Sequence, residues 1–120
     1  MIRGVAEPPR LNPLEFIEPL VHEGSYAQAN CILRKGDRPI QFTWLYNGKI
    51  INTNEDIQID LTGRSSILTI DPVKFRHQGA YTCVATNMAG QDEYSSDLAV
   101  NGIRYYKFLA NILSMRFDVN

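Results

Sequence analysis

The sequence predicts an all-β domain built as a two-sheet sandwich, and three observations support this. The only two cysteines among the 120 residues, Cys31 and Cys83, lie on either side of the only tryptophan, Trp44. Tyr81 precedes the second cysteine by two residues, which is the spacing of a tyrosine corner, where a phenol binds upstream backbone. Short alternating runs of apolar and polar residues are separated by turn signals such as Asn47-Gly48, a pattern typical of strands rather than helices.

The two cysteines are placed to join the sheets of such a sandwich. Inner sheet faces stand about 10 Å apart, a gap that one disulfide can cross. A Cys31–Cys83 bond would close a loop of about 50 residues and stabilise the fold by about 4 kcal/mol. We expect Trp44, Tyr81 and Leu68 in the core around it. A disulfide indicates an oxidising compartment, and the alternative is an intracellular sandwich with the same core and reduced thiols.

The strands follow in order from the alternation. The first long run turns Ala27, Ala29, Cys31 and Leu33 to one side and the residues between them to the other. Asn47-Gly48 predicts a two-residue hairpin, because this dipeptide accepts positive φ. The proline-rich segment 7–13 predicts an interdomain approach followed by an edge strand. The expected strands are 27–33, 42–46, 49–51, 57–61, 66–70, 81–85 and 98–100.

The chain divides into an N-terminal extension (1–6), one sandwich domain (7–102) and a C-terminal tail of unknown nature (103–120). Residues 1–6 lack the apolar run of a secretory signal, which by itself favours the cytosol. The disulfide and the Pro-Pro approach both belong outside the cell, so we expect the chain to be a piece of a longer secreted precursor. Charged residues interrupt the apolar residues of the tail, so no membrane insertion is predicted there. The alternatives for the tail are a short amphipathic helix and sequence from outside the domain.

Composition argues against several functions. The net charge is −1, with basic and acidic residues interspersed, so no nucleic acid or anionic membrane is expected as a partner. The two histidines, His22 and His77, are far apart in the sequence, and no free thiol remains once the cysteines pair. They also cannot supply the four ligands of a zinc site. The sequence therefore predicts no catalytic residues, no metal and no cofactor.

Residues 7–102 resemble the intermediate set (I-set) of immunoglobulin domains, on the motifs at 44–49, 66–70 and 79–90. The segments 8–16 and 35–40 are further similar to the Down syndrome cell adhesion molecule (Dscam) family, most of all to its arthropod variable domain. One position departs from the set's common pattern, because His77 stands where aspartate is usual. We expect His77 to be a solvent-exposed turn residue.

The resemblance implies an extracellular, cell-surface recognition module of a longer membrane-anchored protein. It would bind an identical domain as an antiparallel dimer, giving homophilic adhesion and self-recognition in neurons, with an immune role in arthropods. One alternative is an immune receptor that binds foreign ligand through loops 35–40 and 87–92, and another is an intracellular structural domain. The candidate interface residues are Tyr26, Gln28, Asn30, Ile32, Gln58, Asp60, Ile67 and Thr69.

Overall fold

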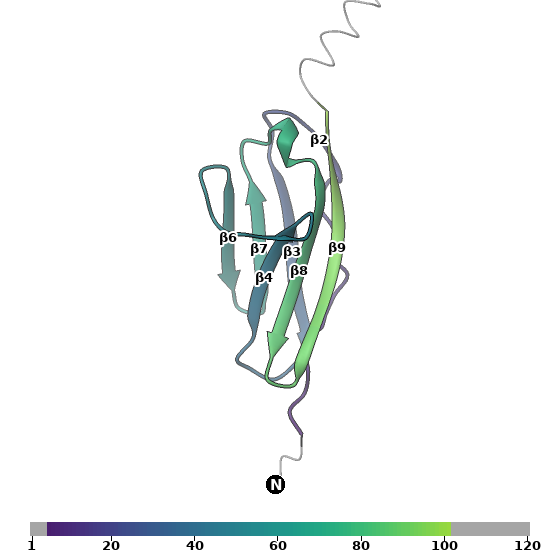
Figure 1. Cartoon of the computed structure of the whole chain (residues 1–120), viewed down its shortest axis with the longest axis vertical. Coiled ribbons are helices and arrows are strands. Elements are labelled where there is room, and N and C mark those ends of the chain that lie inside the picture. Colours follow the sequence, from purple (N-terminus) through teal and green to yellow (C-terminus); the bar gives the residue numbers. More distant parts are fainter. Residues whose placement is uncertain (1–4, 102–120) are drawn as a thin grey trace, which may run out of the picture.

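Alternating burial along the strands builds the two-sheet sandwich that the sequence predicts. The computed structural model describes residues 5–101, and Figure 1 shows the two sheets packed face to face. One sheet has the order β1-β3-β7-β6, with strands Arg10–Leu11, Ala27–Lys35, Ser65–Ile70 and Ile57–Thr62. The other has the order β2-β9-β8-β4-β5, with strands Leu20–His22, Gly90–Asn101, Gly79–Asn87, Gln41–Tyr46 and Lys49–Ile51.

The predicted strands are all present, and the described residues contain no helix except the single 3₁₀ turn η1 (Phe75–His77). The N-terminal segment differs from the expected single edge strand. It divides into β1, antiparallel to β3, and β2, parallel to β9. Pro13 and Pro19 lie between the two strands, and proline cannot donate to a continuous ladder. The predictions for 1–4 and 102–120 lie outside the described residues.

Two neighbouring links join the sheets at the centre of the core. Cys31 and Cys83 form the predicted disulfide, with their Cα atoms 6.3 Å apart. Ser66 stands opposite Cys31 in one sheet, and Trp44 stands opposite Cys83 in the other. The indole Nε1 of Trp44 donates to Ser66 Oγ at 2.9 Å, and both residues are buried. A covalent bond and a hydrogen bond therefore hold the same point of the sandwich together.

Two turns that the sequence predicts, the Asn47-Gly48 hairpin and the tyrosine corner, are present in the structure. Asn47 and Gly48 have φ values of 48° and 85°, so the predicted two-residue hairpin joins β4 to β5. The Tyr81 hydroxyl donates to the backbone oxygen of His77 at 2.6 Å, as a tyrosine corner does. Its ring contacts Phe16 edge-on, with centroids 5.3 Å apart. Tyr81 therefore fixes both the turn before β8 and the N-terminal segment.

The proline-rich entry to the domain is held against one end of the sandwich. Asn87 Nδ2 donates to the backbone oxygens of Glu7, at 2.7 Å, and Asp37, at 2.9 Å. Asp37 also accepts from the Glu7 amide through Oδ2. Gly36, at φ 137°, lets the chain pass close to Pro9, because a Cβ there would lie 2.6 Å from Pro9 Cα. The start and the end of the described chain lie at opposite ends of the sandwich (Figure 1).

We predict that Ser66→Ala lowers the free energy of unfolding by about 1–3 kcal/mol, because it leaves the buried Trp44 N–H without an acceptor. Chemical denaturation monitored by tryptophan fluorescence measures this. Ser65→Ala, at the more exposed neighbouring position, is the matched control and should change stability by no more than about 0.5 kcal/mol. Equal stability of both variants would show that the indole bond contributes nothing.

Candidate protein-binding surface

Seven of the eight side chains predicted as an interface lie on the outward side of β3, β7 and β6, and the eighth, Tyr26, directly precedes β3. Alternation places them there, because Ala29, Cys31 and Leu68 between them point into the core. Tyr26 is 60% exposed and Ile32 40%. We call this set the outer sheet face, and it comprises Tyr26, Gln28, Asn30, Ile32, Gln58, Asp60, Ile67 and Thr69.

Strand register arranges six of these residues in two rows across the sheet. Ile32 stands opposite Ser65, so it is a diagonal neighbour of Ile67 and not its direct partner. Such diagonal neighbours are within reach of long side chains. The first row is Gln28, Thr69 and Gln58, and the second is Asn30, Ile67 and Asp60.

Amide side chains dominate the polar groups of the outer sheet face. Gln28 Nε2 donates to Thr69 Oγ1 at 3.2 Å, and Gln58 Nε2 donates to the Asp60 carboxylate at 3.1 and 3.2 Å. Asn30 Oδ1 is buried and has no hydrogen-bond partner among the described residues. Asp60 is the only charged member of the set. The face therefore combines few charges with donors and acceptors that can exchange partners.

An apolar hollow adjoins the outer sheet face where the N-terminal segment leaves β3. Its volume is about 280 Å³, and its lining includes Ile17, Leu20, Tyr26 and Gln28. Ile17 is 62% exposed and Leu20 52%. Sequence reasoning missed Ile17 and Leu20. A signal was available, because Ile17 directly follows the inward-facing Phe16 and must therefore point outward if that segment is extended.

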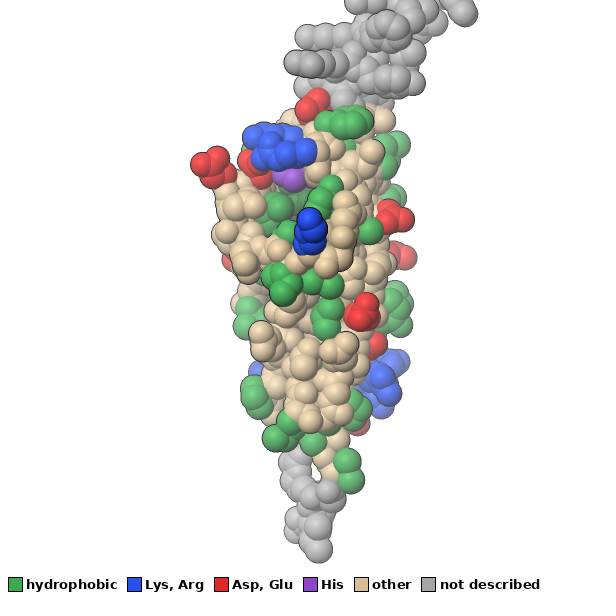
Figure 2. All heavy atoms as spheres, in the orientation of Figure 1, with side chains coloured by type: hydrophobic (Ala, Val, Ile, Leu, Met, Phe, Trp, Pro, Cys, Tyr) green, Lys and Arg blue, Asp and Glu red, His purple; other side chains and the backbone are tan. Residues whose placement is uncertain are grey.

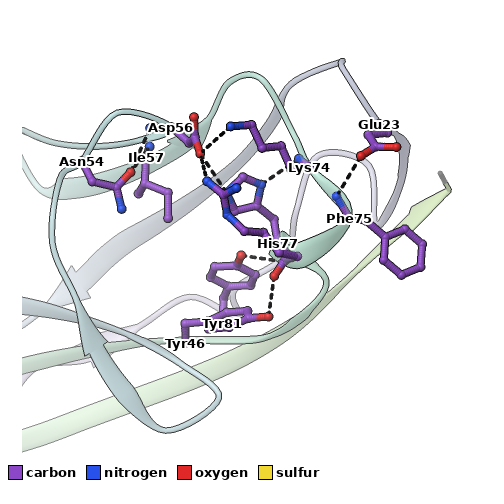
Figure 3. Close-up of polar contacts among 10 residues, drawn as sticks. Glu23, Tyr46, Asn54, Asp56, Ile57, Lys74, Phe75, His77 and Tyr81 are labelled. Carbon is purple, nitrogen blue, oxygen red and sulfur yellow. Dashed lines mark hydrogen bonds and ion pairs between the residues drawn. The ribbon is translucent and has the colours of Figure 1, made fainter. Parts of the chain in front are cut away.

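A second polar cluster surrounds Asp56 at the end of the sandwich that carries η1. The Asp56 carboxylate is buried and forms ion pairs with Arg76, with Lys74 at 3.4 Å, and with His77 at 3.7 Å if the imidazole is protonated. Figure 2 shows basic, acidic and histidine side chains gathered at this end, and Figure 3 shows them converging on the carboxylate. The cluster ties η1 to the turn before β6.

The expectation that His77 is exposed in a turn is wrong, because the residue is only 6% exposed. His77 Nδ1 accepts a hydrogen bond from the Lys74 amide at 2.8 Å (Figure 3). Burial lowers the pKa of His77 below its ordinary value, and the Arg76 charge lowers it further, while Asp56 opposes the shift. The imidazole thus serves as a neutral backbone acceptor, so its role here is structural.

The lowered pKa of His77 predicts a pH dependence of stability. A buried neutral histidine contributes stability above about pH 6.5, its ordinary pKa, and loses it as the pH falls through the folded-state pKa. We therefore expect the free energy of unfolding to decline below about pH 6.5, by at most about 1.4 kcal/mol per pH unit for one proton.

The matched variant for this prediction is His77→Asn, whose Oδ1 can accept from the Lys74 amide without titrating. Denaturant unfolding at several pH values between 7 and 5.5 should show a shallower decline for the variant than for the wild type. The same slope in both proteins would contradict the assignment of the decline to His77.

Comparison with known proteins identifies the family of this sandwich. The model of the immunoglobulin I-set domain matches residues 16–100, which include both cysteines, Trp44 and the tyrosine corner. The chain belongs to the immunoglobulin I-set family. Its domains in cell adhesion molecules are non-enzymatic, and this chain is not an enzyme. Within residues 5–101, no group of three or more His, Cys, Asp or Glu is placed to hold a metal ion.

Within the I-set, the chain is similar to Dscam proteins. It is 39% identical over 99 residues to Cell adhesion molecule Dscam1 of Drosophila melanogaster, covering 81% of this chain and 5% of that protein. It is 35% identical over 96 residues to human Cell adhesion molecule DSCAM, covering 80% and 5%. The chain thus spans about one twentieth of these relatives. The crystal structure of Dscam1 Ig7 domain, isoform 9, matches with TM-score 0.74 and 39% identity, over 78% of this chain and 99% of that one.

The described residues contain no helix long and apolar enough to cross a membrane. The similarity to cell adhesion molecules supports an extracellular, cell-surface context for this domain.

Proposed function

We propose that this chain is an extracellular recognition module of a longer, membrane-anchored protein, and that it binds an identical domain on a neighbouring cell. The two copies meet through their outer sheet faces in an antiparallel dimer. The result is homophilic cell adhesion, by which a cell recognises another cell that carries the same molecule, as in neuronal self-recognition. Support comes from the chain's similarity to proteins named cell adhesion molecules.

The composition of the outer sheet face carries this proposal. Protein interfaces have few charged residues at their centre and enrich aromatic ones. Among the eight residues of the face, only Asp60 is charged, while Tyr26 and Ile32 expose apolar area to solvent. A sheet face of this kind can be covered by the surface of a second sheet. A second copy provides such a surface, because a two-fold dimer uses the same patch on both subunits.

We predict that Ile32→Asp abolishes aggregation of cells or beads that display this domain. A two-fold axis would place the new carboxylate in the interface twice, where burying it without a partner is costly. The folded monomer should keep its stability, because Ile32 points away from the core. Gln28→Glu should act in the same direction, because it also places an unpaired carboxylate in the interface twice.

The matched control is Met88→Asp, which also replaces an exposed apolar side chain, here 89% exposed in the loop between β8 and β9. It should leave aggregation unchanged. If Met88→Asp abolished aggregation and Ile32→Asp did not, the loops would be the binding surface and the homophilic sheet proposal would fail. Thermal unfolding of each variant confirms that the fold is intact.

One observation favours the alternative of a receptor that binds foreign ligand through loop 35–40. A hollow of about 290 Å³ opens at this loop, lined by Arg38, Pro39 and Ile40 together with Leu61 and Arg64. Two guanidinium groups beside apolar side chains suit a ligand that carries a carboxylate next to an apolar group. The homophilic proposal is preferred because the similarity is to cell adhesion molecules, whereas this alternative rests on the hollow alone.

A further inference from the structure

We infer that the two copies meet in one register, with the two-fold axis lying over the inward row formed by Phe16, Ala29, Leu68 and Ile59. In this register, Gln58 of one copy contacts the partner's Asp60, and Tyr26 contacts the partner's Ile32. The inference rests on the proposed function, because it names the side chains through which the same face recognises its own copy.

The strand pairing defines this row. Ala29 stands opposite Leu68, and Leu68 stands opposite Ile59, while Phe16 bridges to Ala29 from the N-terminal segment. When two sheets pack antiparallel around an axis perpendicular to the strands, each strand lies over its own copy in the reverse direction. Outward residues at equal distances on either side of the axis therefore face each other.

The facing pair on β6 is complementary, and no like charges of the outer sheet face meet in this register. On β6, the Gln58 amide meets the partner's Asp60 carboxylate, and the pair occurs twice. On β7, Ile67 meets Thr69. On β3, Gln28 meets Asn30, and one step further out Tyr26 meets Ile32. Gln58 and Asp60 already bond each other within one chain, so dimerisation exchanges one such internal contact in each copy for the two contacts between copies.

Neighbouring registers pair the same residues less well. An axis over the row Asn30, Ile67 and Asp60 would place Asp60 against the partner's Asp60, and like charges facing each other are costly. An axis over the row Gln28, Thr69 and Gln58 would place Ile67 against the carboxylate of Asp71. An axis over Cys31 and Ser66 would place Ile32 against Asn30 and leave Tyr26 uncovered.

Two features of the isolated domain fit the inferred register independently of charge. The partner's Ile32 faces the end of β3 where Ile17, Leu20 and Tyr26 line the apolar hollow of about 280 Å³. An apolar side chain is thus brought to an apolar hollow. Asn30 Oδ1 lacks a hydrogen-bond partner among the described residues. The partner's Gln28 amide supplies an N–H donor for it once the Asn30 carboxamide turns outward.

A charge exchange on β6 tests the register, measured by sedimentation equilibrium of the full chain and by bead aggregation. Gln58→Glu places a carboxylate against the partner's Asp60 at both copies of this pair and should weaken self-association by about tenfold or more. Gln58→Lys places an ammonium against that carboxylate and should strengthen it. The double variant Gln58→Glu/Asp60→Lys should recover self-association, because each new carboxylate at position 58 then faces a new ammonium at position 60 of the other copy.

Beads that carry the double variant should also not mix with beads that carry the wild-type chain. In a mixed dimer its new carboxylate at position 58 would face the wild-type Asp60, so beads carrying the two proteins should form separate aggregates. The register would be overturned if the double variant did not recover self-association, or if Gln58→Lys left the affinity unchanged. Ile32→Asp would still test the outer sheet face independently of the register. If the wild-type chain formed no dimer and no aggregates, both the register and the proposed function would be overturned. Thermal unfolding of the variants separates a lost contact from a lost fold.

Discussion

The rest of this structure depends on two neighbouring links between the sheets, a disulfide and a side-chain hydrogen bond. The disulfide fixes Cys31 and Cys83 as inward residues of facing strands, and the hydrogen bond from Trp44 to Ser66 fixes their cross-strand neighbours in the same way. A strand that slipped by one residue would turn all these groups outward. Because the inward set is fixed, the outward set on β3, β7 and β6 is fixed too, and that set is the proposed recognition surface.

This dependence explains how much the sequence alone could predict. Period-two alternation around Cys31 placed Gln28 and Ile32 on the outward side of their strand, and the Asn47-Gly48 dipeptide placed the hairpin between β4 and β5. The cross-strand neighbours of these residues could not be predicted in this way. That Ile32 stands opposite Ser65 and not Ile67 depends on strand register, which a local pattern does not contain.

The other features that the sequence did not predict arise from contacts between segments that are distant in the chain. His77 is buried because η1 packs against the turn that carries Asp56, and nothing in the residues around His77 indicates that neighbour. The hollow beside Tyr26 exists because the N-terminal segment leaves β3 to pair with β9.

The ends of the sandwich and its outer sheet face have different roles. The ends are tied by polar clusters that stabilise turns, while the outer sheet face carries no charge except at Asp60 and is available to a partner.

The most direct test of this account is an isotope-filtered nuclear Overhauser experiment on a dimer in which only one copy carries ¹³C and ¹⁵N. Such an experiment observes protons of one copy that lie close to protons of the other. Antiparallel pairing in the inferred register predicts cross-peaks between the Tyr26 ring of one copy and the Ile32 methyl groups of its partner. Cross-peaks that arose only from loop 87–92, or that joined Ile32 to the Ile32 of the other copy, would contradict it.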